Sequence, residues 1–530
     1  MIQNTISNLL NKNNLLMEEA KRNIQEIYLA DQRPWVVGYS GGKDSTTVVQ
    51  LVFEALNALP KDQLHKKVYV ISSDTLVETP LIIQSINTTL RRIQESAMER
   101  GLPFETHKVK PLPEQSFWAN IIGRGYPSPN QTFRWCTDRL KIDPANRFIM
   151  DKVDKFGEVI MVLGVRENES ATRDNVIKSY SVEGEVLMKH STLSNAYVFA
   201  PIRQFSTEDV WDYLLNEPSP WGDDNHALNK LYQDSNSSEC PLVVDKEIKD
   251  SAGSCGNSRF GCWVCTVVNE DKSLNGFIQS GSDWLRPLLE FRNWLASIRD
   301  DRRLREKNRK NGGVYYQKLK HEKRDDTTYV IIPEKRGSRA RQEVPVEDFD
   351  PYRFKKKELK QKLIEHEIDL NSPDCPEILI EMEDEKDQGK KYALLGLGPF
   401  TIEARQEILI KLLETQRDLT PPGNEELELI REEELKVIRR LWFEDGEWKD
   451  PLPGIYRDIM GTDLDWEYDD RPLFTDEQVS DLELLCQDYG VDFKMLKKLV
   501  FTERQYAGYK VRRGVHREIE RVLNQGYLHL

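Results

Sequence analysis

The sequence contains no run of about 18 apolar residues, the length that an α-helix needs to cross a membrane. Its first residues, MIQNTISNLLNKNN, lack the basic start and apolar centre of a secretion signal. Cysteine is scarce, with seven in 530 residues, which is unlike a small exported protein held together by disulfides. These absences predict a cytoplasmic protein without a membrane anchor.

The sequence also lacks a basic overall charge, because its formal net charge at pH 7 is −14. Such a chain is not expected to coat nucleic acid through charge alone, although a local basic face remains compatible with it. Hydrophobic residues make up 38% and charged residues 31%, which is typical of a globular protein. A length of 530 residues exceeds one compact core and predicts two or three domains.

Short apolar segments alternate with amphipathic helical patterns in the first half of the chain. Strands are predicted at 35–38, 68–71 and 159–163, and helices at 45–59, 79–99 and 206–215. This alternation predicts an α/β fold with a doubly wound parallel sheet. The domains expected are an α/β domain with a cysteine cluster at 1–270, a basic helical segment at 271–365 and a mainly helical C-terminal domain at 366–530.

A glycine-rich loop follows the strand at 35–38 and precedes a helix, with the sequence Ser40-Gly41-Gly42-Lys43-Asp44-Ser45. Glycines let the backbone turn tightly and bring its N–H groups to an anion, and the helix N-terminus is positive at the same point. Asp44 is compatible with such a loop if it helps to hold magnesium or the loop itself. The loop is not a Walker A motif, which needs a glycine in place of Val37 and Ser or Thr in place of Asp44. An ordinary turn is the alternative, but the whole motif predicts a phosphate site.

Polar side chains also follow the other two predicted strands. Ser72-Ser73-Asp74-Thr75 ends the second strand, and a segment from Gly164 to Arg173 follows the third. Because ligands of such folds bind at the carboxyl ends of the strands, both segments are candidates for nucleotide contact. Arg166 and Arg173 could clamp an anion through their forked guanidinium groups. The alternative is a pair of solvated surface arginines.

Four of the cysteines fall within 26 residues, and a fifth, Cys136, stands apart. The four are Cys240, Cys255, Cys262 and Cys265. The CxxC pair at 262–265 supplies two thiolates from one tight turn, so a four-thiolate site needs two more. An iron–sulfur cluster, a structural zinc ion and metal-free redox thiols are all compatible with this spacing. Cys486 is expected in a helical core, and Cys375 receives no role.

The loop resembles the SGGxDS pyrophosphate loop of the ATP pyrophosphatases, the PP-loop superfamily, which split ATP between its α and β phosphates. The segments at 72–75 and 164–173 are similar to those of its phosphoadenylylsulfate (PAPS) reductase branch. The resemblance implies an adenine nucleotide α-hydrolase-like fold at 1–270, with ATP and Mg²⁺ as cofactors. It implies nucleotide contacts for Ser40, Gly41, Gly42, Lys43, Asp44, Ser45, Ser73 and Asp74. It implies catalytic roles for Lys43, Asp44, Arg166 and Arg173.

Cluster-bearing members of that branch place one cysteine site after an Arg-x-Cys segment and another at a later CxxC. Cys136, Cys262 and Cys265 match these places, although paired cysteines stand in the family where Trp135 precedes Cys136. The resemblance therefore implies a [4Fe–4S] cluster, with zinc as the runner-up. Cys255 is expected to be the fourth ligand and Cys240 a possible carrier of persulfide sulfur.

The run Arg134-Trp135-Cys136-Thr137-Asp138-Arg139-Leu140-Lys141, the cysteine spacing and the segments at 395–416 and 504–514 resemble the DndC family. These are the sulfurtransferases of bacterial DNA phosphorothioation. The resemblance implies DNA as the substrate, a cysteine desulfurase as the sulfur donor and the other Dnd proteins as partners. The alternatives are a PAPS reductase-like enzyme, a transfer-RNA thiolation enzyme, or a nucleotide-binding scaffold in a DNA-modification complex.

Two basic stretches with interleaved tyrosines, at 302–324 and 353–357, are candidates for contacts with DNA phosphates. Such contacts would weaken steeply as the salt concentration rises. The alternative is the solvated face of a charged helix.

Overall fold

The structure is a computed structural model, and the chain in it forms two compact units. Unit 1 comprises residues 1–112 and 134–289, and unit 2 comprises residues 113–133 and 290–530. The residues described are 2–130, 133–167, 187–190, 193–235, 261–306, 309, 316–333, 341–368, 375–383, 390–424, 427–466, 474–507 and 512–523. The chain thus leaves unit 1 for residues 113–133 and then returns to it.

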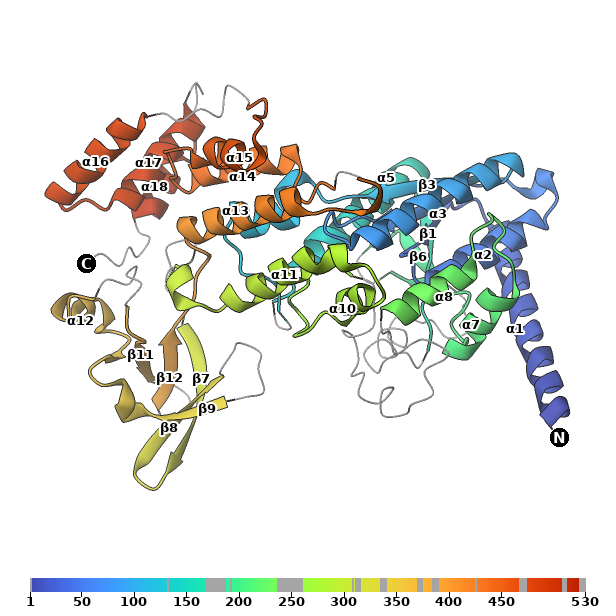
Figure 1. The fold of residues 1–530 in the computed structure, drawn as a ribbon, viewed down its shortest axis with the longest axis horizontal. Helices are drawn as coiled ribbons and strands as arrows, with labels where there is room; N and C mark the ends of the chain where they lie inside the picture. Colours follow the sequence, from blue (N-terminus) through green and yellow to red (C-terminus); the bar gives the residue numbers. More distant parts are fainter. Residues whose placement is uncertain are drawn as a thin grey trace. The chain divides into compact units, whose positions relative to one another are not determined.

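Unit 1 is built on a six-stranded sheet with the strand order β3-β2-β1-β4-β6-β5. Figure 1 labels β1, β3 and β6 of this sheet. Its strands are β1 (Trp35–Gly38), β2 (Val68–Ser73), β3 (Phe104–Val109), β4 (Val159–Val162), β5 (Met188–Lys189) and β6 (Ala196–Phe199). All neighbours pair in parallel except β5, which is antiparallel to β6. The prediction of a doubly wound parallel sheet is confirmed. The strand order reverses between β1 and β4, and this switch point is where ligands bind in such folds.

Helices cover both faces of this sheet. They are α1 (Ile2–Ala30), α2 (Lys43–Asn57), α3 (Pro80–Glu99), α4 (Trp135–Thr137), α5 (Asp143–Phe156), α7 (Thr207–Asn216), α8 (Asn225–Asp234) and α10 (Lys272–Gln279). The α11 helix (Arg286–Ile298) begins at the end of unit 1. The α7 helix starts at a capping box in which the Ser206 side chain accepts from the Asp209 N–H, so the predicted helix at 206–215 is confirmed.

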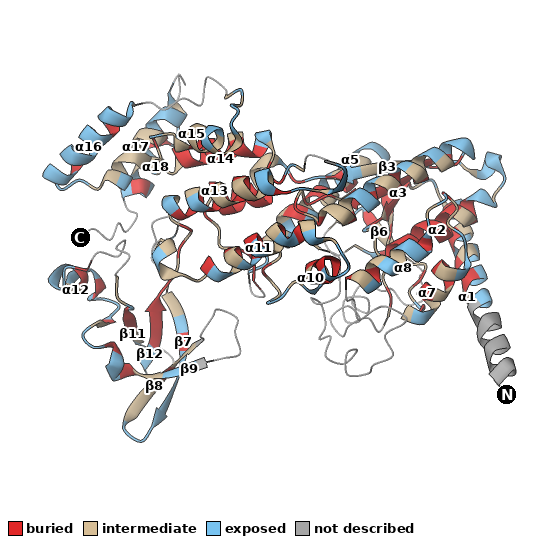
Figure 2. Cartoon of the chain, viewed as in Figure 1, coloured by how far each residue is buried: buried red, intermediate tan, exposed pale blue. Residues whose placement is uncertain are grey.

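The two faces of the unit 1 sheet have different helical partners. On one face, Ile149 and Val153 of α5 pack against a cluster that includes Val36 of β1. Neighbouring residues of a strand point to opposite faces, so Trp35 and Val37 lie on the other side. There Phe53 of α2 contacts Phe104 of β3, with ring centroids 5.1 Å apart. Burial on both sides explains why β1 reads as a continuous apolar run. Figure 2 shows that α2, which covers one of these faces, is itself largely buried.

Unit 2 contains a second six-stranded sheet, with the order β10-β11-β12-β7-β8-β9. Its strands are β7 (Tyr316–Arg324), β8 (Thr327–Pro333), β9 (Arg341–Pro345), β10 (Arg353–Lys355), β11 (Leu379–Glu383) and β12 (Lys390–Leu395). The prediction of a basic helical segment at 271–365 is therefore wrong for residues 316–355. Most of β7 is exposed, with only Leu319 buried, so its charged residues belong to a solvated strand and not to a helix face.

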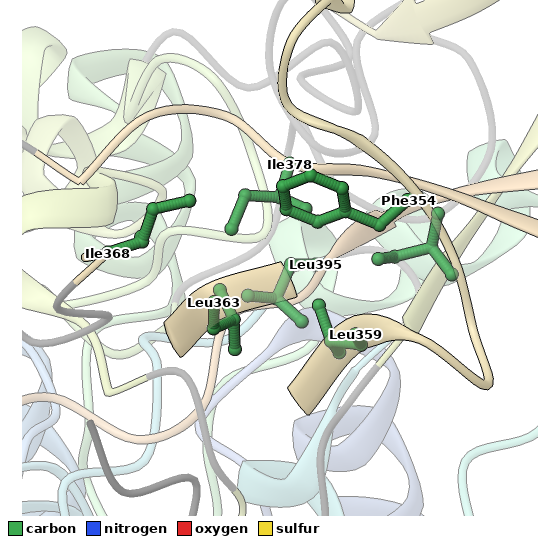
Figure 3. Packing of buried hydrophobic residues seen from close by; sticks show 7 residues of the cluster. Phe354, Leu359, Leu363, Ile368, Ile378 and Leu395 are labelled. Carbon is green, nitrogen blue, oxygen red and sulfur yellow. The ribbon is translucent and has the colours of Figure 1, made fainter. Parts of the chain in front are cut away.

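The second sheet has apolar packing on both faces. The α12 helix (Leu359–Glu365) supplies Leu359 and Leu363 to a cluster of seven buried residues that includes Phe354 (Figure 3). A second cluster joins Leu319, Val330 and Leu394 with the turn at Val346–Phe349. Short strands thus gain stability from neighbouring segments that close over them.

The remainder of unit 2 is mainly helical, as predicted for 366–530 apart from β11 and β12. Its helices are α13 (Ile402–Asp418), α14 (Glu432–Glu444), α15 (Pro451–Met460), α16 (Asp476–Asp488), α17 (Phe493–Tyr506) and α18 (Val515–Leu523). Residues 113–133 pack among these helices. Trp118 donates through Nε1 to the Leu429 carbonyl at 2.7 Å, and Trp442 donates to the Ile122 carbonyl at 2.8 Å. Within the described residues, no helix is long and apolar enough to cross a membrane.

Glu434 of α14 is a buried carboxyl group with an elevated pKa. Its Oε2 atom accepts from the Arg431 N–H at 3.1 Å, and its Oε1 atom has no hydrogen-bond partner among the described residues. Burial raises its pKa from 4.5 to about 7, while contacts with Ser116 and Arg431 oppose the rise and the charge of Glu433 adds to it. The folded state therefore keeps a proton that the unfolded chain has already lost above pH 4.5.

Stability of this region is expected to fall as the pH rises from 4.5 to about 7, and to stay level above that. The total loss is on the order of 3 kcal/mol. Glu434→Gln removes the ionisation, so it is expected to slow amide hydrogen exchange in α14 at pH 8 but not at pH 4.5. Equal exchange rates of the two proteins at pH 8 would contradict the assignment. Exposed Glu403 of α13, changed to Gln, is the control.

Candidate active site

The glycine-rich loop joins β1 to α2 and is closed by its own serines. The Ser45 Oγ atom accepts from the Ser40 N–H at 3.1 Å and donates to the Gly42 carbonyl at 2.9 Å. Gly41 has a φ of +74°, and a Cβ added there would lie 2.7 Å from Cγ1 of Ile86. Both the backbone conformation and the close contact require glycine at this position. These contacts therefore hold the backbone of the loop in one conformation where α2 begins.

Two buried cations meet one carboxylate at the start of α2. Lys43, 1% exposed, places its Nζ atom 3.0 Å from Oδ2 of Asp44. Arg166, 4% exposed, places its Nε atom 2.6 Å from Oδ1 of the same side chain. Two positive charges against one negative charge leave this cluster with a net charge of about +1, beside the positive end of a helix. The arrangement favours an anion at the loop.

The segment after β4 packs directly against the loop. A Cβ added to Gly164 would lie 2.9 Å from the backbone carbon and oxygen of Asp44, so only glycine permits this approach. Arg166 also donates through its Nη1 atom to Thr207 Oγ1 at 3.3 Å and to the Phe205 carbonyl at 3.5 Å. The structure thus brings Arg166, from the segment at 164–173, together with Lys43 and Asp44 of the loop.

Asp74, at the end of β2, shapes a strained turn. Its backbone N–H donates to the Val109 carbonyl at 2.9 Å, and its Oδ1 atom accepts from the Leu76 N–H at 3.0 Å. Leu76 has a φ of +67°, which is unfavourable for a residue with a side chain. The Lys108 ammonium lies 3.7 Å from Oδ2 of Asp74. Strain of this kind is common at functional sites, and contact of Ser73 and Asp74 with nucleotide stays a prediction.

The same turn carries the CxxC pair. Glu78 forms an isolated antiparallel bridge with Cys262, and the Trp263 N–H donates to the Val77 carbonyl at 3.0 Å. Thr75 Oγ1 lies 3.3 Å from the Cys262 thiol sulfur and donates to Glu78 Oε1 at 3.0 Å. The end of β2 therefore links the candidate nucleotide site to the thiols through six consecutive residues, 74–79.

Three thiols and two charged side chains share one electrostatic environment. Burial raises the pKa of Cys262, and the nearby Glu78 carboxylate raises it further. Burial also raises the pKa of Cys136, with an added contribution from Cys265. The pKa of Lys141 is raised mainly by Glu78, whose Oε1 atom lies 3.7 Å from Nζ, and also by Cys262, Cys136 and Cys265. Cys136 and the CxxC pair, 126 residues apart in the sequence, therefore all act on the charge of Lys141.

The donor set suits a thiophilic metal group, because thiolates are the usual ligands of iron–sulfur clusters and of structural zinc. In the part of the chain that the structure describes, no three His, Cys, Asp or Glu side chains are already arranged around a single ion. Cys240 and Cys255, the expected sulfur carrier and fourth ligand, lie outside the described residues, as does Arg173. Cys375 and Cys486 lie in unit 2.

Sequence reasoning did not identify three residues that the structure adds to this region. Thr75 and Lys141 each belong to a longer sequence motif that gives them no role of their own, yet both contact Glu78. Tyr232 of α8 accepts from the Lys43 N–H at 3.1 Å, across 189 residues of sequence. No local pattern marks Tyr232, because its partner is set by the packing of α8 against the loop.

Comparison with known proteins finds a match to the phosphoadenosine phosphosulfate reductase domain over residues 34–268. An uncharacterized protein of Methanocaldococcus jannaschii is 25% identical over 248 residues, which are 46% of this chain and 38% of that protein. The chain thus spans well under half the length of this relative.

Solved structures with similarity include the PAPS reductase of Candida auris in a phosphate complex. It is 14% identical, with a TM-score of 0.26 over 42% of this chain and 89% of that one. The U34-tRNA thiolase of Methanococcus maripaludis, with its [4Fe–4S] cluster, is 14% identical, with a TM-score of 0.26 over 41% of this chain and 73% of that one. Over residues 34–268, less than half of its length, the chain is thus similar to the phosphoadenosine phosphosulfate reductase domain.

Proposed function

We propose that the chain is an ATP pyrophosphatase and sulfurtransferase that replaces a non-bridging oxygen of a DNA backbone phosphate by sulfur. The observation that carries the proposal is the short connection between the two candidate sites. Asp74 lies at the carboxyl end of β2, next to β1 and its phosphate loop, and Glu78 pairs with Cys262 only four residues later. A nucleotide site and a thiol site on one turn suit a reaction that couples ATP cleavage to sulfur transfer.

The first step activates the phosphate. A non-bridging oxygen of the DNA phosphodiester attacks the α-phosphorus of ATP, the bond from that phosphorus to the β-phosphate oxygen breaks, and pyrophosphate leaves. The oxygen becomes part of an AMP leaving group, which is far better than oxide. Lys43 and the N–H groups at the start of α2 are suited to hold the departing pyrophosphate, with Mg²⁺ sharing its charge. Arg166 is proposed, with Arg173, to hold the DNA phosphate that is being activated.

The second step delivers sulfur. A sulfur nucleophile attacks the activated phosphorus, and AMP leaves with the former DNA oxygen. If the sulfur arrives as a cysteine persulfide, its outer sulfur forms the bond to phosphorus while still joined to the cysteine sulfur. Two electrons from a dithiol reductant then break this sulfur–sulfur bond, which leaves the phosphorothioate and a free cysteine thiol. A cysteine desulfurase is the proposed sulfur donor, and the other Dnd proteins are proposed partners. Cys136, Cys262 and Cys265 would hold a [4Fe–4S] cluster, which supplies iron sites able to bind sulfide when present.

DNA contacts are proposed for only part of the predicted basic stretches. Three arginines of the first stretch serve the fold: Arg302 donates to the Leu395 carbonyl at 2.6 Å, Arg305 donates to the Gly398 carbonyl at 2.7 Å, and Arg303 pairs with Asp301 at 2.7 Å. Exposed lysines remain on β7 and near β10, namely Lys318, Lys320, Lys323, Lys355, Lys356 and Lys357. These lysines are the candidates for salt-sensitive phosphate contacts.

The deciding experiment measures pyrophosphate release from Mg²⁺–ATP by anaerobically purified protein with a sulfur donor. We expect duplex DNA to stimulate release, and mass spectrometry of the digested DNA to show oxygen-to-sulfur exchange. Stimulation by transfer RNA instead would favour transfer-RNA thiolation. Reduction of PAPS to sulfite, which the family match makes the second candidate, would favour a reductase. Nucleotide binding without turnover, unchanged in Lys43→Ala, would favour a scaffold.

A further inference from the structure

Tyr232 lies at the point where the phosphate loop becomes α2. Its hydroxyl oxygen accepts from the Lys43 N–H at 3.1 Å, and a Cβ added to Gly42 would also lie 3.1 Å from it. The Lys43 ammonium lies 5.8 Å from the centroid of the Tyr232 ring. One side chain of α8 therefore touches the backbone, and faces the cation, of the residue expected to hold phosphate.

This contact involves a group that ordinarily binds anions. The first N–H groups of a helix have no partner within the helix, and a bound phosphate is a usual acceptor for them. The Thr46 N–H closes the first turn of α2 by donating to the Gly42 carbonyl at 2.9 Å. The Lys43 N–H, which precedes it, is the donor that meets Tyr232. The phenol oxygen thus lies within the anion-binding surface of the helix end.

The chemistry of a phenol allows it to bind both partners. A tyrosine hydroxyl carries one proton and two acceptor lone pairs. A lone pair is used by the Lys43 N–H, and rotation about the C–O bond aims the proton at an acceptor within reach. A phosphate oxygen held by the start of α2 is such an acceptor. Tyr232 can therefore bridge the backbone and the phosphate. A hydrogen bond to a charged phosphate oxygen is stronger than one to a neutral oxygen.

The ring of Tyr232 is held in place by its surroundings. Trp211 of α7 meets it edge to face, with ring centroids 5.1 Å apart, and the side chain is buried. The start of α8 is tied to α2, because Asn225 donates to the Gln50 side-chain oxygen at 3.2 Å. A buried ring that already packs against Trp211 does not need to be ordered when the ligand binds, which favours affinity.

We propose that Tyr232 is a further phosphate-binding residue of the loop, and that its hydroxyl donates to the pyrophosphate part of ATP while it accepts from the Lys43 N–H. The proposal rests on the proposed ATP pyrophosphatase function. It assigns the pyrophosphate specificity of the site partly to α8, 189 residues beyond the loop in the sequence.

The test uses the full chain and the variant Tyr232→Phe, which keeps the ring and its packing on Trp211. Calorimetric titration with magnesium pyrophosphate, and separately with AMP, is the measurement. We expect the affinity for pyrophosphate to fall about tenfold, the effect of one hydrogen bond to a charged group. The affinity for AMP is expected to stay unchanged, a difference that a general loss of folding would not produce.

The matched control is Tyr197→Phe on β6, whose hydroxyl contacts Glu158 at 3.4 Å and lies outside the loop. Unchanged affinity of Tyr232→Phe for pyrophosphate would overturn the proposal, and tighter binding would overturn it too by showing that the hydroxyl competes with phosphate. An equal fall in affinity for both ligands would mark Tyr232 as structural. If the unaltered chain binds no pyrophosphate, the proposed function itself fails, and this outcome differs from all the others.

Discussion

Asp44→Ala is expected to abolish pyrophosphate release and to destabilise unit 1. The carboxylate of Asp44 is the shared partner of the Lys43 ammonium at 3.0 Å and the Arg166 guanidinium at 2.6 Å. Both cations are buried, so removal of the carboxylate leaves two like charges close together in a site of low dielectric constant. Removal of one partner of a buried ion pair lowers the free energy of unfolding by roughly 3–5 kcal/mol.

The effect on catalysis follows from the same geometry. Lys43 is proposed to hold the pyrophosphate and Arg166 the DNA phosphate that is being activated, and Asp44 fixes both side chains. Loss of a preorganised group that stabilises developing charge lowers a rate by roughly 10²–10³-fold. We therefore expect a rate reduction of at least about that size in Asp44→Ala. Asp44→Asn keeps an acceptor oxygen and is expected to fold better than Asp44→Ala while remaining impaired.

Chemical denaturation monitored in unit 1, together with a pyrophosphate-release assay, checks both parts. Asp62→Ala is the control, because Asp62 is exposed in the turn at Lys61–Gln63 of the same unit. In a double-mutant cycle, Arg166→Ala should cost less stability in the Asp44→Ala background than alone, because its buried partner has already gone. Additive effects would show that the two side chains do not act as a pair. Wild-type turnover in Asp44→Ala would remove Asp44 from the active site.

The sequence predicts the conformation of the glycine-rich loop and the strand before it well, because each residue there has a local physical reason. Trp35, Val36 and Val37 are buried on both sides of the sheet and so form an uninterrupted apolar run. Gly41 needs a positive φ, which no other residue adopts as readily. These requirements act within a few residues, so a single sequence displays them.

Edge and surface strands are less visible in the sequence. In β7 only Leu319 is buried, so the alternation of apolar and polar residues that marks a strand is missing. Its lysines and arginine then have the composition of a solvated helix, and the sequence predicts the wrong element. The β3 strand has the same weakness: of its six residues only Phe104 and Val109 are buried.

Contacts between distant segments are the other part that the sequence does not reveal. Tyr232 meets Lys43 only because α8 packs beside α2, and residues 113–133 join unit 2 through Trp118 and other contacts with helices about 300 residues later. The group of Cys136, Cys262 and Cys265 was predictable from the sequence only in part. A resemblance to a family linked Cys136 to the CxxC pair, but the roles of Thr75 and Glu78 beside Cys262 appear only in the folded chain.

Cys262→Ala is expected to remove nearly all bound iron and the visible absorption of the anaerobically purified protein. Its thiol lies 3.3 Å from Thr75 Oγ1, and its backbone pairs with Glu78. Burial and the Glu78 carboxylate both raise its pKa, so without a metal the group is a neutral thiol. A bound metal replaces that proton, and loss of one thiolate from a cluster site usually prevents assembly.

The measurement is iron, acid-labile sulfide and zinc per chain, together with the absorption spectrum. Cys136→Ala and Cys265→Ala are expected to behave like Cys262→Ala, because all three thiols contribute to the raised pKa of Lys141 and so belong to the same site. Cys375→Ala and Cys486→Ala are the matched controls, since both residues lie in unit 2, and they should keep the full iron content.

These results separate the metal from the ATP chemistry. Lys43 and Arg166 meet at the loop through Asp44, whereas Cys262 joins the site through the turn at 74–79, so the two parts can fail independently. A Cys262→Ala protein that loses iron but still releases pyrophosphate would place the cluster in the sulfur step alone. One zinc per chain in place of iron would make the thiol site structural. An unchanged iron content in Cys262→Ala would exclude this thiol as a ligand. The proposed cluster would then have to lie elsewhere than beside Thr75 and Glu78.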